Sequence, residues 1–353
     1  MMKTKKFGTL KTGEEATLYI LENKNGMIVS LTDLGAQLVN IQVPDRNGIM
    51  TDCILGSDRF EDYEMGCFMF GSCVGRSANR IARGEFEVGG KTVRLYTYPE
   101  NICHSGPEQW NTRMWNAAAE EDETGASVTF FMRSPDGDQG YPGNMDVEIT
   151  YTLTEDNELI LQFYGVSDKP TIFNMTNHTY FNLHGCEFDA KNTILTIDSD
   201  RFLDTDEGQI PNGIEIPVEG TPFDFRSGRK IGDEVDNFDY EPLRIGDGYD
   251  HNFVINGGKV TEDANLVAKA YDEWSGIAME VYTDRPGLQL YTMNRVFGGE
   301  VKGRHGYTYG PRHAFCLETQ FAPDAVHHPE YESPLVKAHQ ETTAVTIYRF
   351  FTE

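Results

Sequence analysis

The stretch Asp146-Val147-Glu148-Ile149-Thr150-Tyr151-Thr152-Leu153 decides the fold class. Every odd position in it is apolar or aromatic, and every even position is polar. Successive side chains of a β-strand point to opposite faces, so a period of two is typical of a strand with one buried and one solvated face. We therefore predict a strand with one buried and one solvated face here, of the kind that antiparallel sheets commonly contain.

The same alternation recurs on both sides of this stretch. Ile277, Met279 and Val281 alternate with smaller or polar residues, and Gly89-Gly90 separates the apolar positions of 84–88 from those of 91–95. Two glycines supply the positive φ angles of a two-residue hairpin turn. Further strands are expected at 16–22, 26–31, 37–43, 126–133, 157–165, 264–272 and 343–350.

Helical periodicity is scarce, and only residues 58–65 favour a helical turn. The 353 residues include 35 glycines, which fits many chain reversals, and no βαβ rhythm, Gly/Ser-rich linker or short-period repeat interrupts the pattern. The sequence thus predicts an all-β chain, a large antiparallel β-sandwich that forms a single domain over residues 1–353.

Charge excludes several classes of partner. Lys and Arg number 30 against 56 Asp and Glu, which gives a formal net charge of −26. Such a field repels nucleic-acid phosphates and anionic membranes, so neither partner is expected. No run approaches a membrane span, residues 1–6 are followed by polar residues rather than by an apolar leader, and the six cysteines contain no CxxC pair. We expect a cytoplasmic protein with reduced thiols.

Motifs for dinucleotides, P-loop phosphates, zincins and serine hydrolases (GxGxxG, GxxxxGK[ST], HExxH and GxSxG) are absent from the sequence. His327-His328 is an adjacent histidine pair that could bind a metal. A zinc site requires three or four ligands at defined spacing, so a solvated loop is the simpler interpretation of this pair.

Polar and ionisable residues crowd into four otherwise apolar segments: 75–81 with 101–106, 174–183, 247–253, and 316–320 leading into 323–325. Glu318 follows Phe315-Cys316-Leu317, a context that would desolvate a carboxylate and raise its pKa. A carboxylate and an imidazole tuned near neutrality form a general acid–base pair.

Each of these residues has an ordinary structural alternative. Asn174, Asn177 and Asn182 could satisfy turns, His178 could be a hydrogen-bonded structural histidine, Asp250 could be a turn residue, and Glu318 could pair with Arg80 or Arg312. Taken together, the mixture of Asn, Asp, Gln, Arg and His favours a polyol-binding pocket, because a sugar needs many convergent donors and acceptors.

Longer motifs resemble those of the galactose mutarotase (aldose 1-epimerase) family, in the family's order from about residue 15 to the C-terminus. They are Gly75-Arg76-Ser77-Ala78-Asn79-Arg80-Ile81 with Gly84 and Phe86, Asn101 with His104, 134–137 with 140–143, Thr176-Asn177-His178-Thr179-Tyr180-Phe181-Asn182-Leu183, 221–226, Asp250-His251-Asn252-Phe253, 286–292, and Leu317-Glu318-Thr319-Gln320.

The resemblance implies a β-supersandwich that interconverts the α and β anomers of a neutral aldohexose through the open-chain aldehyde, with no metal or organic cofactor. By the family's pattern Glu318 takes the proton of the C1 hydroxyl, His178 protonates the ring oxygen, and His104 assists there. The residues expected to hold sugar hydroxyls are Asn79, Arg80, Asp250 and Gln289. The resemblance does not distinguish a monomer from a homodimer.

The chain departs from the family's pattern at three places. Ser105 replaces a glycine and is expected to narrow the pocket floor, Met293 replaces a small residue near the sugar site, and Lys337-Ala338-His339 replaces a Pro-Gly turn. The first two bear on which aldose is preferred.

Three other functions remain open on the sequence. A non-catalytic sugar sensor could use the same fold, a glycoside hydrolase could use Glu318 with Asp250, and a hexose-6-phosphate 1-epimerase could use Arg76 with Arg80.

Overall fold

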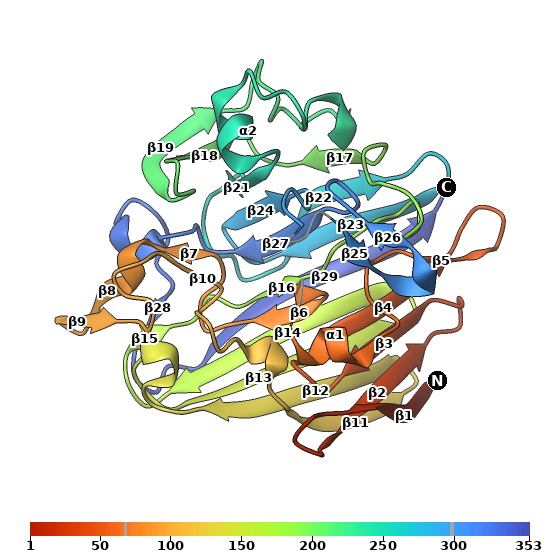
Figure 1. Cartoon of the computed structure of the whole chain (residues 1–353), viewed down its shortest axis with the longest axis horizontal. Coiled ribbons are helices and arrows are strands. Elements are labelled where there is room, and N and C mark those ends of the chain that lie inside the picture. Colours follow the sequence, from red (N-terminus) through yellow and green to blue (C-terminus); the bar gives the residue numbers. More distant parts are fainter. Residues whose placement is uncertain (67–68, 297–299) are drawn as a thin grey trace.

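The structure is a computed structural model, and it describes residues 1–66, 69–296 and 300–353. A large antiparallel sheet runs through the molecule with the strand order β11-β12-β13-β14-β29-β23-β22-β17-β20 (Figure 1). Its strands are β11 (Asn116–Asp122), β12 (Gly125–Ser134), β13 (Met145–Thr154), β14 (Glu158–Ser167), β29 (Thr342–Thr352), β23 (Ile277–Thr283), β22 (Asn265–Tyr271), β17 (Ile194–Ile197) and β20 (Arg229–Lys230).

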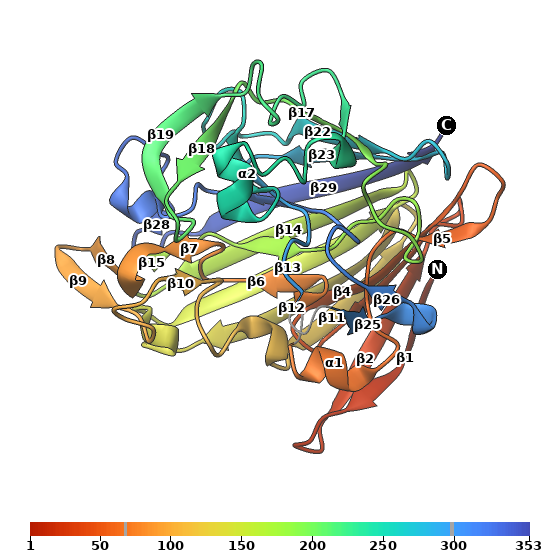
Figure 2. The ribbon, with the colours of Figure 1, turned by 45° about the horizontal axis from the view of Figure 1, so that its top comes forward.

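Two further sheets pack over this one, and Figure 2 shows the layers from a tilted view. The N-terminal sheet contains β1 (Met2–Thr9), β2 (Glu15–Glu22), β3 (Ile28–Thr32), β4 (Gln37–Pro44) and β5 (Met50–Asp52) in chain order. The sheet that carries the site has the order β19-β18-β21-β24-β27, from β19 (Pro211–Pro217), β18 (Arg201–Thr205), β21 (Asp250–Val254), β24 (Gly287–Tyr291) and β27 (Cys316–Gln320).

Short elements connect these sheets. The two-stranded pairs are β6 (Ser72–Val74) with β16 (Thr176–His178), β7 (Arg80–Ile81) with β10 (Ile102–Cys103), β8 (Glu85–Val88) with β9 (Lys91–Arg94), β15 (Thr171–Ile172) with β28 (Leu335–Val336), and β25 (Val301–Lys302) with β26 (Thr308–Tyr309). The α-helices among the described residues are α1 (Phe60–Glu64) and α2 (Glu241–Gly246).

The alternation read from the sequence appears directly in the burial of β13. Its ten residues alternate between buried and solvent-facing positions, with Val147, Ile149 and Tyr151 buried. β14 lies on one side of β13 and β12 on the other, both antiparallel. The prediction of an antiparallel β-sandwich is confirmed, and the Gly89-Gly90 hairpin and the helical turn near residue 60 are also present.

One apolar core joins the layers. Its buried members include Leu21 and Val29 of the N-terminal sheet, Val128 of the large sheet and Leu288 of the site-bearing sheet. Because all three sheets turn an apolar face to this core, burial of apolar surface holds them together. The C-terminal strand β29 lies between β14 and β23, so the two halves of the large sheet meet on it.

Several elements have no counterpart in the sequence predictions, and three examples show the physical reasons. β1 is an edge strand rich in lysine, and most of its residues are exposed, so it has no buried face to reveal a period. Helix α2 is too short to show a helical period. The β18–β19 hairpin changes register between Leu203 and Thr205, which interrupts its alternation. Among the described residues, no helix is long and apolar enough to cross a membrane.

Candidate active site

A cavity of about 580 Å³ opens beside the edge of the site-bearing sheet. It is lined by polar, charged and aromatic side chains drawn from segments far apart in the sequence. The lining residues are Gly66, Met69, Asn79, Arg80, Cys103, His104, Gln109, His178, Tyr180, Gln209, Gly246, Asp250, Tyr291, Asn294, Arg295 and Glu318.

Three neighbouring strands place one group of these side chains. In β21, β24 and β27 the pairing sets Asp250 opposite Tyr291, and Gln289 opposite Glu318. Directly paired residues share a face of the sheet, and so do residues two positions apart. Asp250, Gln289, Tyr291 and Glu318 therefore project from the same face.

The opposite wall comes from two short strand pairs. His178 ends β16, which pairs with β6. Arg80 begins β7 and lies opposite Cys103 of β10, so His104, which follows directly, is brought next to Arg80. The backbone N–H of His104 donates to the carbonyl of Asn79 at 3.0 Å. These short pairings bring Asn79, Arg80, Cys103 and His104 to the cavity.

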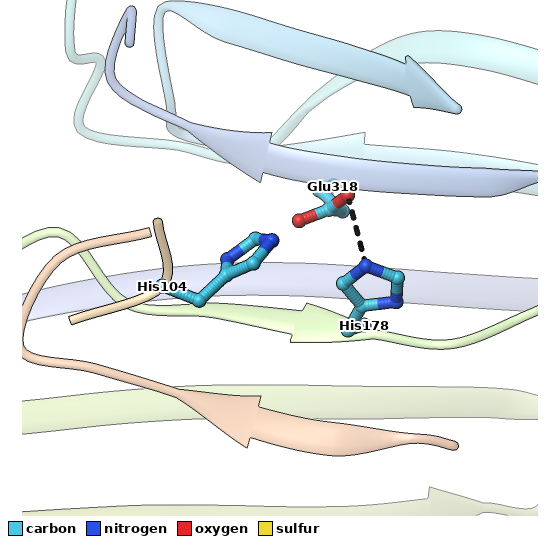
Figure 3. Close-up of side chains that lie close together, drawn as sticks. All are labelled: His104, His178 and Glu318. Atoms are coloured by element: carbon cyan, nitrogen blue, oxygen red, sulfur yellow. Dashed lines mark ion pairs between the residues drawn. The ribbon is translucent and has the colours of Figure 1, made fainter. Parts of the chain in front are cut away.

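Three titratable side chains meet at the inner end of the cavity (Figure 3). Nε2 of His178 lies 3.8 Å from Oε1 of Glu318. The rings of His104 and His178 meet edge to face with centroids 5.2 Å apart. One ligand-type atom from each of the three residues lies within 4.8 Å of the other two. The cluster is close enough for one small molecule to touch all three groups.

Burial sets the protonation of Glu318. Its side chain is 2% exposed, and burial raises its pKa to about 7, partly offset by His104 and reinforced by the charge of Asp250. Its Oε2 is buried and has no hydrogen-bond partner. An unpartnered buried carboxylate oxygen is costly, because desolvation is not compensated. A hydroxyl of a bound molecule would supply the missing donor.

The pKa of His178 is shifted in the opposite direction, downward. Burial, followed by the neighbouring His104, lowers the pKa of His178 to about 3, so the ring is neutral at pH 7. The expectation that both members of the pair titrate near neutrality is correct for Glu318 and wrong for His178, because nothing pairs the imidazolium strongly enough to offset its desolvation. The Sγ of Cys316 lies 3.6 Å from Nδ1 of His178.

His104 has its tautomer fixed by the backbone. The N–H of Asn79 donates to Nδ1 of His104 at 3.2 Å, and burial lowers the pKa of His104. A neutral imidazole whose Nδ1 accepts a hydrogen bond carries its proton on Nε2. The Nε2 of His104 is therefore a donor rather than a free lone pair. This bond weakens the case for a metal ion at the cluster, since a ligating nitrogen must be unprotonated.

The outer part of the cavity is a network of paired charges around Asp250. Arg80 Nη2 donates to Oδ2 of Asp250 at 3.1 Å, and Gln289 Nε2 donates to Oδ1 at 2.7 Å. Gln209 Nε2 donates to Oδ2 at 2.8 Å. Burial alone would raise the pKa of Asp250, but the charges of Arg80 and His251 and the hydrogen bonds from Gln289 and Arg80 lower it. Asp250 is a stable carboxylate, which does not suit the proton donor of a glycoside hydrolase.

The structure brings together six of the seven residues expected in the cavity: Asn79, Arg80, His104, His178, Asp250 and Glu318. Gln289 does not line it. Instead Gln289 lies behind Asp250, on a much smaller adjoining cavity, so its expected direct grip on a hydroxyl is not what the geometry shows. Gln289 on β24 lies beside Asp250 on the paired strand β21, and its amide N–H donates to the Asp250 carboxylate rather than into the cavity.

Sequence reasoning missed three lining residues that matter for shape or charge. Tyr180 and Tyr291 form an aromatic wall with His178, whose ring centroid lies 4.9 Å from that of Tyr180. Tyr180 follows His178 at strand spacing, so a period-two argument from His178 could have found it. Gln209 belongs to the β18–β19 hairpin, and no pattern in the sequence pointed to it.

Two of the departures from the family pattern lie outside the cavity lining. The Ser105 hydroxyl accepts from the backbone N–H of Ser77 at 2.7 Å and donates to its carbonyl at 3.0 Å, so it does not narrow the pocket floor. Met293 is buried in a hydrophobic cluster. The 337–339 segment is a turn, in which Gln340 N–H donates to the carbonyl of Lys337.

The structural alternatives for the charged residues are also resolved. Arg312 pairs with Asp236 at 3.0 Å rather than with Glu318. The Arg76 guanidinium is buried and donates to carbonyls of residues 134–143, so it cannot join Arg80 around a phosphate. His327 bonds to Asp324 at 2.6 Å and His328 to Glu330 at 3.0 Å, so the histidine pair is held by carboxylates.

Comparison with known sequences agrees with this geometry. Residues 17–349 match the model of a family described as Aldose 1-epimerase. The aldose 1-epimerase of Escherichia coli K12 is 36% identical over 345 residues, which cover 97% of each chain. The galactose mutarotase of Homo sapiens is 35% identical over 346 residues, 98% of this chain and 97% of its own.

Solved structures give the same likeness. The galactose 1-epimerase of Lactobacillus acidophilus superposes with a TM-score of 0.85 at 27% identity, covering 100% of this chain and 99% of that one. The aldose epimerase homologue of C. elegans superposes with a TM-score of 0.83 at 28% identity, covering 95% and 98%.

Proposed function

This chain belongs to the aldose 1-epimerase family and is an isomerase acting on a small sugar, and we propose that its cavity binds a neutral aldohexose between Glu318 and the pair Arg80–Asp250. The observation that carries the assignment of residues is the buried carboxylate of Glu318, which lines the cavity beside the imidazoles of His104 and His178 (Figure 3) and whose Oε2 lacks a hydrogen-bond donor. A sugar hydroxyl is the donor that this oxygen needs.

In the proposed reaction Glu318 removes the proton of the C1 hydroxyl while His178 gives a proton to the ring oxygen. The C1–O5 bond breaks and leaves an open-chain aldehyde. Rotation about the C1–C2 bond presents the other face of the carbonyl, and closure runs both proton transfers in reverse. General acid–base catalysis of this kind contributes ~10²–10⁴-fold for each well-placed group. His104 Nε2–H donates a hydrogen bond to the ring oxygen.

The scheme requires Glu318 and His178 to hold one proton between them, and their pKa values agree with this. Between a pKa of about 3 for His178 and about 7 for Glu318, the two groups together hold a single proton. The reactive form, a carboxylate with an imidazolium, also holds one proton. The fraction of enzyme molecules in this reactive form is therefore constant between the two pKa values. It decreases below the lower value and above the higher one, since coupled sites titrate as a pair.

The remaining lining residues hold the sugar. Asp250 and Arg80 accept from and donate to hydroxyls, Asn79 supports Arg80 through a 3.2 Å bond to its Nη1, and Gln289 supports Asp250 from behind. Tyr180 and Tyr291 pack against the apolar face of the ring, as aromatic side chains do in sugar sites. Galactose is the first substrate to test, because the relatives are named for it.

Polarimetry tests the proposal directly. Freshly dissolved α-galactose, α-glucose and α-xylose are followed with and without the protein, and the spontaneous rate is subtracted. We expect acceleration with galactose or glucose. Equal rates with and without protein for all three sugars would overturn the choice of substrate class.

We further propose that residues 1–353 form one domain in the cytoplasm that binds neither nucleic acid nor membranes. The support is the position of β29 between the two halves of the large sheet, the net charge of −26, and the free thiols of Cys53, Cys73, Cys103, Cys186 and Cys316. A single thermal unfolding transition, recovery in the soluble cell fraction and no retention on heparin are expected. Light scattering would decide between monomer and homodimer.

A further inference from the structure

Gln209 lies between the two charged residues of the outer cavity and bonds to both. Its Oε1 accepts from Nη2 of Arg80 at 2.8 Å, and its Nε2 donates to Oδ2 of Asp250 at 2.8 Å. The direct Arg80–Asp250 contact is 3.1 Å. The Gln209 side chain therefore bridges an ion pair that is already in contact. It is 7% exposed, so water does not replace these bonds easily.

The chemistry of the bridge requires an amide. A guanidinium only donates and a carboxylate only accepts, so a side chain that bonds to both must offer one acceptor and one donor. The reversed amide would set NH₂ against the guanidinium and oxygen against the carboxylate, so the neighbours fix its orientation. Gln289 fills the other carboxylate oxygen at 2.7 Å. With both glutamines in place, Asp250 has one defined position.

The hairpin loop holds Gln209 at this point. Oδ1 of Asp206 accepts from the backbone N–H groups of Gly208 at 2.8 Å and Ile210 at 3.0 Å, and the Gln209 N–H donates to the carbonyl of Asp206 at 2.8 Å. Gln209 has φ +58°, a left-handed conformation that disfavours residues with a Cβ. A glycine would relieve the strain but would remove the amide, so the loop keeps a strained residue that reaches the cavity.

We propose that Gln209 is a positioning residue for sugar binding, which holds Arg80 and Asp250 in the geometry that grips the hydroxyls of the substrate. The proposal rests on the function given above, since it concerns the binding end of that cavity. It assigns Gln209 no part in proton transfer, because its bonds go to Arg80 and Asp250 and not to Glu318 or His178. Its loss should therefore weaken binding and leave the chemical step largely intact.

Gln209→Ala is the first test, with kcat and KM measured separately by polarimetry. Hydrogen bonds to charged groups contribute enough to predict a KM increase of about 10- to 100-fold, while kcat stays within about threefold. Glu207→Gln is the matched control in the same loop. Glu207 pairs with Arg244 at the surface and touches neither Arg80 nor Asp250, so KM should stay within about twofold of wild type.

Gln209→Glu separates positioning from a purely structural role. A glutamate keeps the acceptor for Arg80, but only its protonated form can donate to Asp250. The KM of Gln209→Glu should therefore rise with pH relative to wild type, whereas loss of folding alone would show no such titration. Thermal unfolding of each variant checks that the fold persists.

Two results would overturn the inference. One is a wild-type KM in a folded Gln209→Ala protein, and the other is a fall in kcat with KM unchanged. Failure of the proposed function looks different, because wild-type protein would then not accelerate mutarotation at all. Calorimetry can measure galactose affinity without turnover in Glu318→Gln and in the double variant that also carries Gln209→Ala. Equal affinities of the two variants would also contradict the proposal.

Discussion

At the inner end of the cavity Glu318 is a buried carboxylate whose Oε2 has no partner, whereas at the outer end both oxygens of the Asp250 carboxylate accept hydrogen bonds. Asp250 lies on β21 and Glu318 on β27, the two strands that flank β24 in one sheet, and both side chains are buried. Burial raises the pKa of Glu318 to about 7, while the pKa of Asp250 is held below its usual value by Arg80, His251 and the Gln289 amide.

The difference shows that burial alone does not decide what a carboxylate does. A desolvated and unpaired carboxylate binds a proton near neutral pH and can exchange it with a substrate. A carboxylate with a cation and two amides stays ionised and rigid, and it offers a fixed acceptor. Within one cavity, the hydrogen-bond partners therefore separate proton transfer from substrate holding.

The largest effect is expected for Glu318→Gln. The amide keeps the shape of the side chain and removes the base, so kcat should fall ~10²–10⁴-fold while sugar binding largely persists. His178→Asn should cost a similar factor, and the double variant much less than the product of the two, because both groups act in one proton-transfer event. Polarimetry with α-galactose measures the rates. If Glu318→Gln kept more than about a tenth of wild-type kcat, the base would have to be assigned to Asp250.

Stability should change in opposite directions at the two ends. The pKa of Glu318 is near its ordinary value of 4.5 in the unfolded chain and about 7 in the folded protein, so the folded state loses stability as pH rises through that window. At pH 8, Glu318→Gln should be more stable than wild type by about 3 kcal/mol, at 1.36 kcal/mol per pKa unit.

Asp250→Asn should instead destabilise the protein by about 3 kcal/mol, because it leaves the buried Arg80 charge without its partner. Urea unfolding at pH 5 and pH 8 measures both changes. Equal shifts of the same sign in the two variants would show that the contrast between the two ends is wrong.

Asp250→Asn should act on activity mainly through KM. The amide retains one acceptor for a hydroxyl but gives up the charge that Arg80 and Gln209 hold in place. We expect KM to rise about 10- to 100-fold, as for the loss of a hydrogen bond to a charged group, with kcat within about tenfold of wild type. Initial rates over a range of galactose concentrations give both constants, and an unchanged KM would contradict a role in sugar binding.

The pH dependence should report the shared proton. Since the reactive form holds one proton on Glu318 and His178, kcat/KM should be flat below about pH 7 and fall about tenfold per unit above it. The charge of Asp250 raises the pKa of Glu318, so in Asp250→Asn the midpoint should move to lower pH. A wild-type profile that rises through pH 7 would mean that the carboxylate acts with a neutral His178.

The smallest effect is expected for Ser105→Gly. The Ser105 side chain bonds to the Ser77 backbone and does not line the cavity, and its φ of +71° suits glycine. We expect KM for galactose, glucose and xylose to stay within about twofold of wild type. A change in the order of preference among the three sugars would show that this position influences the pocket after all.

The sequence by itself determined the fold class and most of the cavity. A period of two survives in strands such as β13 because one face of each strand must be apolar to reach the core. Motif resemblance identified His178, Glu318 and Asp250 as site residues, because their residue types can transfer protons or accept hydrogen bonds. Neither source of information required knowledge of which strands are neighbours.

Only the tertiary structure decided what each polar residue bonds to. Asp250 and Glu318 are both acidic residues within largely apolar strands. The residues around them in the sequence do not reveal that Asp250 pairs with Arg80 while Oε2 of Glu318 has no hydrogen-bond partner. The place of Gln289 behind Asp250 and the arrival of Gln209 from a distant hairpin follow from strand pairing and loop geometry. Such contacts join residues far apart in the chain, and because a local pattern records only what lies within a few residues, it cannot contain them.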